Sequence, residues 1–145
     1  MLFLLLALYL PGPIPATFSN LSLETLDLSN NKLGGDIPAD LGNALKLATV
    51  NLANNRLTGT FPKSLWNART ILLSNNLLTT LPSGHLPEPI GSVQELNIAS
   101  NQLSGNGKNI VTLSRIQSFV GFVSAQSKCN GIICVKIHPR ALKLE

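Results

Sequence analysis

The chain has 145 residues, a formal net charge of +4, only 12% charged and 5% aromatic residues, and an excess of Leu (28) and Asn (15). Its apolar content excludes a disordered chain, its few charges argue against a soluble helical bundle, and its two Cys argue against a disulfide scaffold. Because Leu and Asn rise together, the composition indicates a regular apolar framework joined by regular polar turns, and therefore an internal repeat.

Residues 1–15 form an apolar N-terminal segment that has two interpretations. The apolar run over residues 2–10 is too short to span a bilayer. It resembles the core of a secretion signal, but no basic residue lies near its start and no small-residue cleavage site follows. A shift of 23 residues along the chain instead aligns Phe3, Leu10 and Ile14 with core positions of the first clear repeat. This alignment favours a degenerate first repeat.

Four copies of one pattern lie within residues 16–105. Each copy approximates L-x-L-S-x-N-x-L-x-G-x-I-P, and its Asn recurs at spacings of 24, 21 and 25 residues. The recurring residues are Asn31, Asn55, Asn76 and Asn101. In the first copy, Leu26 and Leu28 alternate with polar residues, which predicts a short β-strand with its Leu side chains pointing inward.

The remainder of each copy predicts a turn and a return path. The Asn amide has donors and an acceptor that can satisfy the backbone groups of a buried turn, so we expect a structural ladder of Asn side chains. Gly35 permits a backbone angle that other residues resist, and residues 39–43 start a short helical turn. One such coil cannot bury its own apolar side, so successive coils must stack.

The third copy departs from the pattern. Its back segment is short, because Ile71 lies nine positions after Pro62, whereas Val50 lies twelve positions after Pro38. A Pro-rich insert over residues 83–89 then follows. The insert is either a tolerated irregular loop or a binding loop that interrupts the stack.

The pattern resembles the plant-type leucine-rich repeat over about residues 3–105. It is similar to the extracellular domains of plant receptor-like kinases and receptor-like proteins, and to the polygalacturonase-inhibiting proteins. The resemblance implies an α/β fold, a leucine-rich-repeat solenoid with a parallel β-sheet on its concave face and short helical or 3-10 turns on its convex side. It also implies that the concave face or its edge binds a partner.

Residues 106–145 are expected to be an irregular, basic segment that caps the solenoid. Residues 107–145 have a net charge of +5, whereas the rest of the chain has −1. The segment from Ser118 to Cys134 loosely resembles the S-F-x-G-N…C-G-x-x-x-C sequence that closes plant-type solenoids. A disulfide between Cys129 and Cys134 would tie such a cap in an oxidising compartment. Two free thiols are the alternative.

The resemblance places the ligand-binding surface on the strand residues that point out of the concave face. These are Thr25, Asp27, Ser29, Thr49, Asn51, Ala53, Thr70, Leu72, Ser74, Glu95, Asn97 and Ala99. This small, mostly neutral and polar surface suits a peptide or a protein loop with hydrogen-bonding groups. It lacks the Tyr, Trp and Arg side chains that usually contribute most to tight binding, so we expect weak affinity.

The sequence contains no recognisable catalytic constellation, and we predict that the protein is not an enzyme. His85 and His138 lack the neighbours of a known triad, and no set of four ligands predicts a metal site. We expect no cofactor, and the nearly neutral repeat region argues against nucleic acid as a partner. Asn20 begins the sequence Asn-Leu-Ser, an acceptor for glycosylation that fits secretion.

The predicted function is therefore non-enzymatic binding of a protein or peptide by a receptor-like ectodomain or a fragment of one. We expect an extracellular or cell-surface location, with membrane contact only through sequence that flanks this chain. Three alternatives remain: an inhibitor of a cell-wall-degrading hydrolase, a purely structural stacking segment of a larger receptor kinase, and a basic tail that docks on an anionic lipid or polymer.

Overall fold

The computed structural model describes residues 2–4, 9–44, 46–82, 93–103, 111–113, 118–120 and 135–137. The strands in these ranges are β1 (Leu2–Leu4), β2 (Pro11–Gly12), β3 (Thr25–Asp27), β4 (Lys32–Asp36), β5 (Thr49–Asn51), β6 (Arg56–Thr58), β7 (Thr70–Leu72), β8 (Glu95–Asn97), β9 (Val111–Leu113), β10 (Ser118–Val120) and β11 (Val135–Ile137). The 3-10 helices are η1 (Ala16–Asn20), η2 (Leu41–Asn43) and η3 (Lys63–Asn67). No helix within these ranges is long and apolar enough to cross a membrane.

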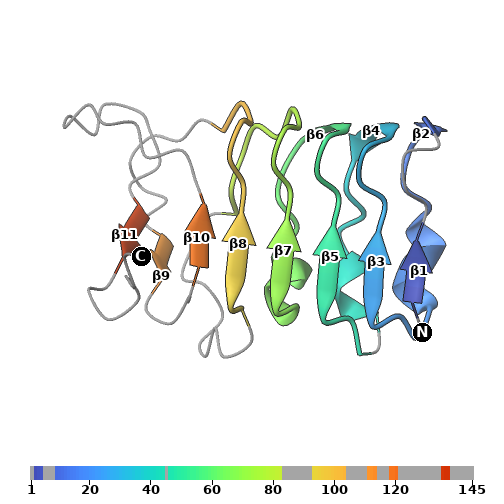
Figure 1. Cartoon of the computed structure of the whole chain (residues 1–145), viewed down its shortest axis with the longest axis horizontal. Coiled ribbons are helices and arrows are strands. Elements are labelled where there is room, and N and C mark those ends of the chain that lie inside the picture. The colour runs from blue at the N-terminus through green and yellow to red at the C-terminus, as the bar shows by residue number, and fades with distance from the viewer. Residues whose placement is uncertain are drawn as a thin grey trace.

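Successive coils stack side by side and contribute parallel strands to a main sheet (Figure 1). The strand order in this sheet is β1-β3-β5-β7-β8-β10, and strands β2, β4 and β6 form a second sheet. The register aligns Leu26 with Val50, Val50 with Ile71, and Ile71 with Leu96. All four side chains are buried, which confirms the predicted α/β solenoid and its inward Leu positions.

The first strand continues the same register toward the N-terminus. Phe3 of β1 pairs with Leu26 of β3, which is the alignment given by a shift of 23 residues. Gly12 of β2 has a positive φ of 98°, as Gly35 of the next coil has one of 76°. Ile14 is buried in the core. The backbone of this segment therefore follows the path of a coil.

The main sheet also extends beyond the last clear copy of the repeat. Phe119 of β10 pairs with Leu96 of β8, and Ser118 pairs with Glu95. Val111 of β9 pairs with Val135 of β11 in a separate pair of parallel strands. The segment expected to be irregular thus contains regular strands, which the absence of the Leu and Asn pattern concealed.

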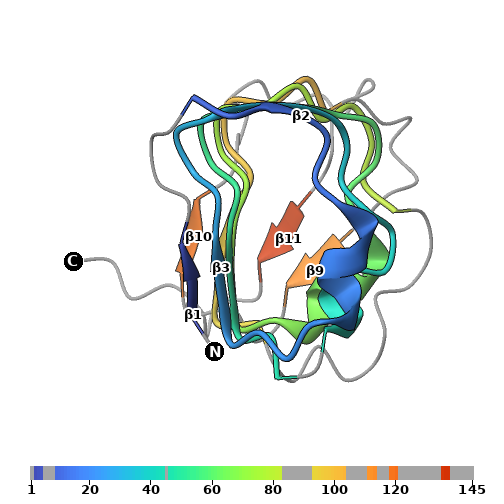
Figure 2. The same cartoon turned by 90° about the vertical axis from the view of Figure 1, so that its right-hand side faces the viewer.

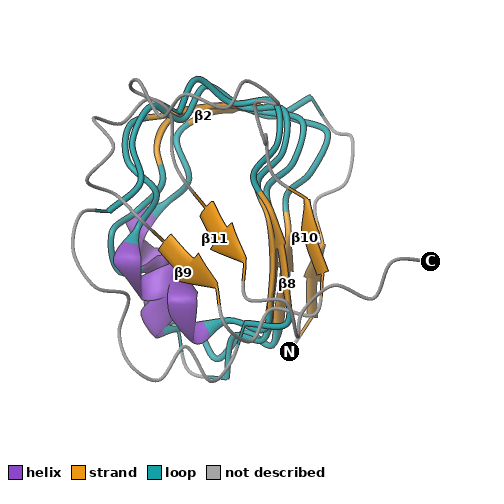
Figure 3. Ribbon diagram, turned by 90° about the vertical axis from the view of Figure 1, so that its left-hand side faces the viewer, coloured by secondary structure: helices purple, strands orange, loops and turns teal. Residues whose placement is uncertain are grey.

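Views along the stack show strands on one side and 3-10 helices on the opposite side, as the repeat predicts (Figures 2 and 3). Apolar side chains from the strands, the turns and the 3-10 helices fill the space between the two sides of the solenoid. The largest fully buried ones are Phe61, Leu23, Leu26, Leu41, Leu52, Leu57, Leu65, Ile71, Leu73, Leu78, Leu81 and Leu96. A single apolar core therefore runs through the coils that the structure describes.

The repeated Asn side chains lie inside the turns and join each coil to the one before it. The Asn55 side chain donates to the carbonyl oxygens of Leu28 (2.9 Å), Leu52 (3.1 Å) and Ala53 (3.3 Å), and it accepts from the N–H of Leu33 (3.0 Å). Asn31, Asn76 and Asn101 make equivalent bonds, each accepting from a backbone N–H of the preceding coil. These side chains satisfy backbone groups that no strand pairing reaches.

The 3-10 helices η2 and η3 are in close contact at Gly42. The Ser64 hydroxyl accepts from the N–H of Gly42 (3.0 Å) and donates to the carbonyl oxygen of Ala39 (2.6 Å). A Cβ atom at Gly42 would overlap the backbone carbonyl of Ser64. Only glycine therefore allows these two turns to approach so closely.

We expect Trp66→Phe to change the free energy of unfolding by less than about 1 kcal/mol. Trp66 is buried against Phe61, with ring centroids 4.5 Å apart, and its Nε1 has no hydrogen-bond partner among the described groups. Phe keeps most of the packing and removes a donor that costs free energy when buried alone. Guanidinium denaturation followed by circular dichroism tests this, and a loss above 3 kcal/mol would mean that the indole N–H is paired.

Candidate functional site

Eight of the twelve predicted contact residues lie in two rows across the main sheet. One row pairs Thr25, Thr49, Thr70 and Glu95 in register across β3, β5, β7 and β8. A second row consists of Asp27, Asn51, Leu72 and Asn97. Every side chain in these two rows is half-buried. The sheet thus brings eight of the predicted residues onto one surface, which we call the sheet face.

Some polar side chains of the sheet face form hydrogen bonds within the chain. Asp27 accepts from the N–H of Ser29 (2.9 Å) with one carboxylate oxygen and from the Nδ2 of Asn51 (3.0 Å) with the other. The Oδ1 atoms of Asn51 and Asn97 each accept from the N–H two residues further on, at 3.2 Å. These local bonds fix the turns at the strand ends and leave fewer groups for a ligand.

Ser29 departs from the expectation that it would be exposed on the sheet face. Its side chain is only 4% exposed, and its hydroxyl accepts from the Nδ2 of Asn30 (3.2 Å). The equivalent residues of later coils, Ala53, Ser74 and Ala99, are half-buried. Ser29 is therefore not available as a contact residue.

The sheet face has acidic but no basic side chains among its predicted residues. Asp27 and Glu95 are its charged groups, and Thr hydroxyls and Asn amides surround them. Hydrogen-bond donors and cationic groups of a ligand fit such a surface. Rows of hydrogen-bonding side chains of this kind are suited to recognition of a polar ligand.

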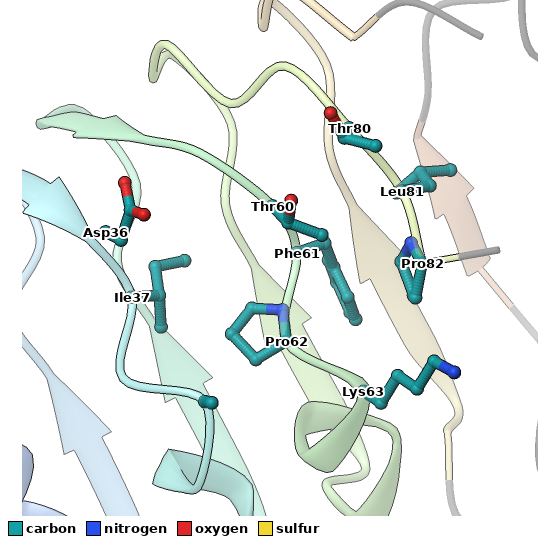
Figure 4. A pocket seen from close by; sticks show the side chains of 10 residues that line it. Asp36, Ile37, Thr60, Phe61, Pro62, Lys63, Thr80, Leu81 and Pro82 are labelled. Carbon is teal, nitrogen blue, oxygen red and sulfur yellow. The ribbon is translucent and has the colours of Figure 1, made fainter.

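A groove of about 630 Å³ lies elsewhere, on the flank between the second sheet and the 3-10 helices (Figure 4). Buried Ile37, Phe61 and Leu81 come from three successive coils, and Asp36 and Lys63 lie on opposite sides. None of the twelve predicted residues lines it. Its volume is that of a small-ligand site, but its polar groups do not converge.

The sequence interpretation missed a row of exposed residues beyond the carboxyl ends of the main-sheet strands, where the second sheet begins. These residues are Tyr9, Lys32, Arg56, Leu77 and Gln102, and we call them the edge row. The last four each directly follow a ladder Asn. A variable position directly after each ladder Asn was the signal that could have identified most of the row.

Several predictions concern residues outside the part of the chain that the structure describes. These are the Pro-rich insert at residues 83–89, His85, the pair Cys129 and Cys134, and His138. Asn20 is described, and its side chain is exposed at the end of η1, accessible for glycosylation. Among the described residues, no group of three or more His, Cys, Asp or Glu side chains could hold a metal ion.

Comparison with known proteins agrees with the repeat. The Leucine Rich Repeat family model matches residues 22–44 and 46–68. The BIR2 ectodomain from Arabidopsis thaliana is 34% identical, with a TM-score of 0.59, over 68% of this chain and 54% of that chain. No curated protein has a sequence similar enough to count as a relative.

Two further solved structures are receptor complexes. The Arabidopsis receptor kinase HAESA, solved with the peptide hormone IDA and the co-receptor SERK1, is 27% identical with a TM-score of 0.56 over 66% of this chain and 16% of that chain. The PEPR1–AtPEP1 structure is 26% identical with a TM-score of 0.51 over 77% of this chain and 21% of that chain. This chain thus spans about half of the BIR2 ectodomain and a much smaller part of the other two. The stacked coils, the asparagine ladder and these similarities identify the chain as a leucine-rich-repeat protein of the plant type.

Proposed function

We propose that this chain is a receptor-like ectodomain, or part of one, that binds a peptide or a protein loop through the sheet face. The observation that carries the proposal is the alignment of two half-exposed polar rows across β3, β5, β7 and β8. Thr hydroxyls, Asn amides and the Glu95 carboxylate offer hydrogen-bond donors and acceptors at regular spacing. Half-exposed rows on paired strands hold those groups in place before the ligand arrives.

The similar structures support a non-enzymatic, extracellular role. BIR2 was solved as an ectodomain, and HAESA was solved with a peptide hormone and a co-receptor. A peptide partner fits the composition of the sheet face, which favours hydrogen bonding over burial of large apolar groups. The small number of aromatic contacts predicts micromolar or weaker binding by this chain alone.

A blocking substitution on the sheet face tests the proposal. Peptides are selected from a phage-displayed random library on the full chain, and their affinities are then measured for Thr49→Arg and Thr70→Arg. Each Arg side chain projects from the middle of the sheet face, where neither Thr side chain has a hydrogen bond within the described residues. We expect these variants to weaken the selected peptides at least tenfold.

The matched control is Asn43→Ala, because Asn43 is an exposed residue of η2 on the opposite side of the solenoid. We expect it to bind the selected peptides as the original chain does. If peptides bind both Thr variants with unchanged affinity, the binding surface lies elsewhere and the proposal is overturned.

A further inference from the structure

The edge row occupies one backbone position in successive coils. Tyr9, Lys32, Arg56 and Leu77 each precede a Leu whose N–H donates to the ladder Asn of the next coil, at 3.0 Å in every case. Lys32 and Arg56 are the first residues of β4 and β6, at the upper edge in Figure 1. The row is thus adjacent to the sheet face but distinct from it.

The composition of the edge row is typical of an interface. Tyr9 (67% exposed) and Leu77 (39% exposed) are the large apolar side chains that the described region exposes to solvent. Lys32 lies over the Tyr9 ring, with its ammonium 5.2 Å from the ring centroid. Tyr and Arg are enriched at protein interfaces, and exposed apolar side chains gathered on one line are unusual for a surface without a partner.

The cations of the edge row have no counter-charge of their own. Neither Lys32 nor Arg56 forms a salt bridge in the part of the chain that the structure describes. The charged side chains of the sheet face, Asp27 and Glu95, are acidic. The edge row therefore favours an anionic ligand, and the sheet face favours a cationic one. An acidic segment therefore complements the edge row, whereas it is repelled from the sheet face.

A second row makes the edge rigid. Asn30, Asn54 and Asn75 adopt positive φ angles of 58°, 58° and 56°. The Asn54 amide donates to the Oδ1 of Asn30 (3.0 Å), and the Asn75 amide donates to the Oδ1 of Asn54 (2.8 Å). This bonded row fixes the turns that carry Lys32 and Arg56, so a ligand loses little free energy in ordering their backbone.

We propose that the edge row is a docking strip for an acidic, extended peptide segment. Two carboxylates on the same face of the segment pair with Lys32 and Arg56, and an apolar side chain of that face packs against Leu77. Adjacent coils are about 4.8 Å apart, so the strip from Tyr9 to Leu77 is about 14 Å long. That length matches about four residues of extended chain. The inference rests on the proposed function in one respect, since both take a peptide as the partner.

The test uses a fluorescent peptide with two Glu residues and a Leu at alternate positions, and the same peptide with Gln in place of Glu. Binding to the full chain is measured by fluorescence anisotropy at low ionic strength. We expect the Glu peptide to bind, and Lys32→Glu with Arg56→Glu to weaken it at least tenfold, because like charges then face each other. Leu77→Ser should weaken it severalfold, which a purely electrostatic attraction would not produce.

The matched control is Lys63→Glu, which reverses an exposed cation on the flank groove. We expect it to leave binding within twofold. If Lys63→Glu lowers the affinity for the peptide as much as the double variant does, the change in net charge explains the loss. If the double variant binds the peptide with unchanged affinity, the peptide binds elsewhere, as on the basic C-terminal segment. Either result overturns the docking strip. Thr49→Arg separates the two proposals, because it blocks the sheet face and leaves the edge row intact.

Discussion

Asn55→Ala is expected to lower the free energy of unfolding by about 3 kcal/mol or more. The substitution leaves the buried N–H of Leu33 without its acceptor, and it removes one of the two amide donors of the Leu28 carbonyl oxygen, which keeps only Asn31. Two further carbonyl oxygens in its own turn lose a donor as well. A small domain has a total stability of only about 5–15 kcal/mol, so this change removes a large share. Guanidinium denaturation followed by circular dichroism measures the shift.

Two companion variants make the Asn55 prediction specific. Asn55→Asp keeps an oxygen for the N–H of Leu33 but replaces the donor with a second acceptor facing carbonyl oxygens, so it should also be strongly destabilising. Asn43→Ala removes an exposed amide whose side chain donates to Asp40 (3.2 Å), and its effect should be within about 0.5 kcal/mol. A loss for Asn55→Ala as small as that of Asn43→Ala would refute the structural role of the ladder.

Gly42→Ala is expected to destabilise the protein by about 3 kcal/mol. The new Cβ atom would overlap backbone atoms of Ser64, which cannot move aside as a flexible side chain could. The two 3-10 helices would have to separate, which weakens the bond from the Gly42 N–H to the Ser64 hydroxyl. Thermal unfolding should show a lower midpoint without a change in the folded-state spectrum at low temperature.

Gly34→Ala is the matched control for Gly42→Ala. A Cβ atom at Gly34 would meet only the carbonyl oxygen of Arg56, at an ordinary 3.7 Å. The substitution also restricts the unfolded chain, so stability should stay unchanged or rise by about 0.5 kcal/mol. Equal destabilisation by the two variants would show that the lost flexibility of glycine, and not the contact with Ser64, causes the effect.

The repeat made most of the fold predictable, because residues at the same position of each coil meet the same surroundings. Leu26 is buried because it alternates with polar residues in a strand, and Val50, Ile71 and Leu96 follow from the same position in later copies. The similar structures confirm the fold class that this pattern predicts. The position of the ladder Asn also follows from the pattern alone.

Features that depend on contact between coils were not predictable in the same way. The burial of Ser29 depends on how one turn closes, and the need for glycine at position 42 depends on a residue 22 positions further along the chain. The edge row could not be predicted from the repeat, because the residues at its positions differ from copy to copy. Binding through the sheet face stays a prediction, since a repeat that specifies the scaffold does not specify its ligand.

The parallel register of the coils has a consequence for how the protein folds. Within the described residues, strands and 3-10 helices contact mainly their counterparts in adjacent coils. In a stack held together by contacts between adjacent coils, order can begin at any well-packed coil and spread outward one coil at a time. Hydrogen exchange should therefore be slowest around β5 and β7, the two central strands of the main sheet, and faster toward its ends. A defect in one coil would divide the chain into two cooperative units that lose structure separately.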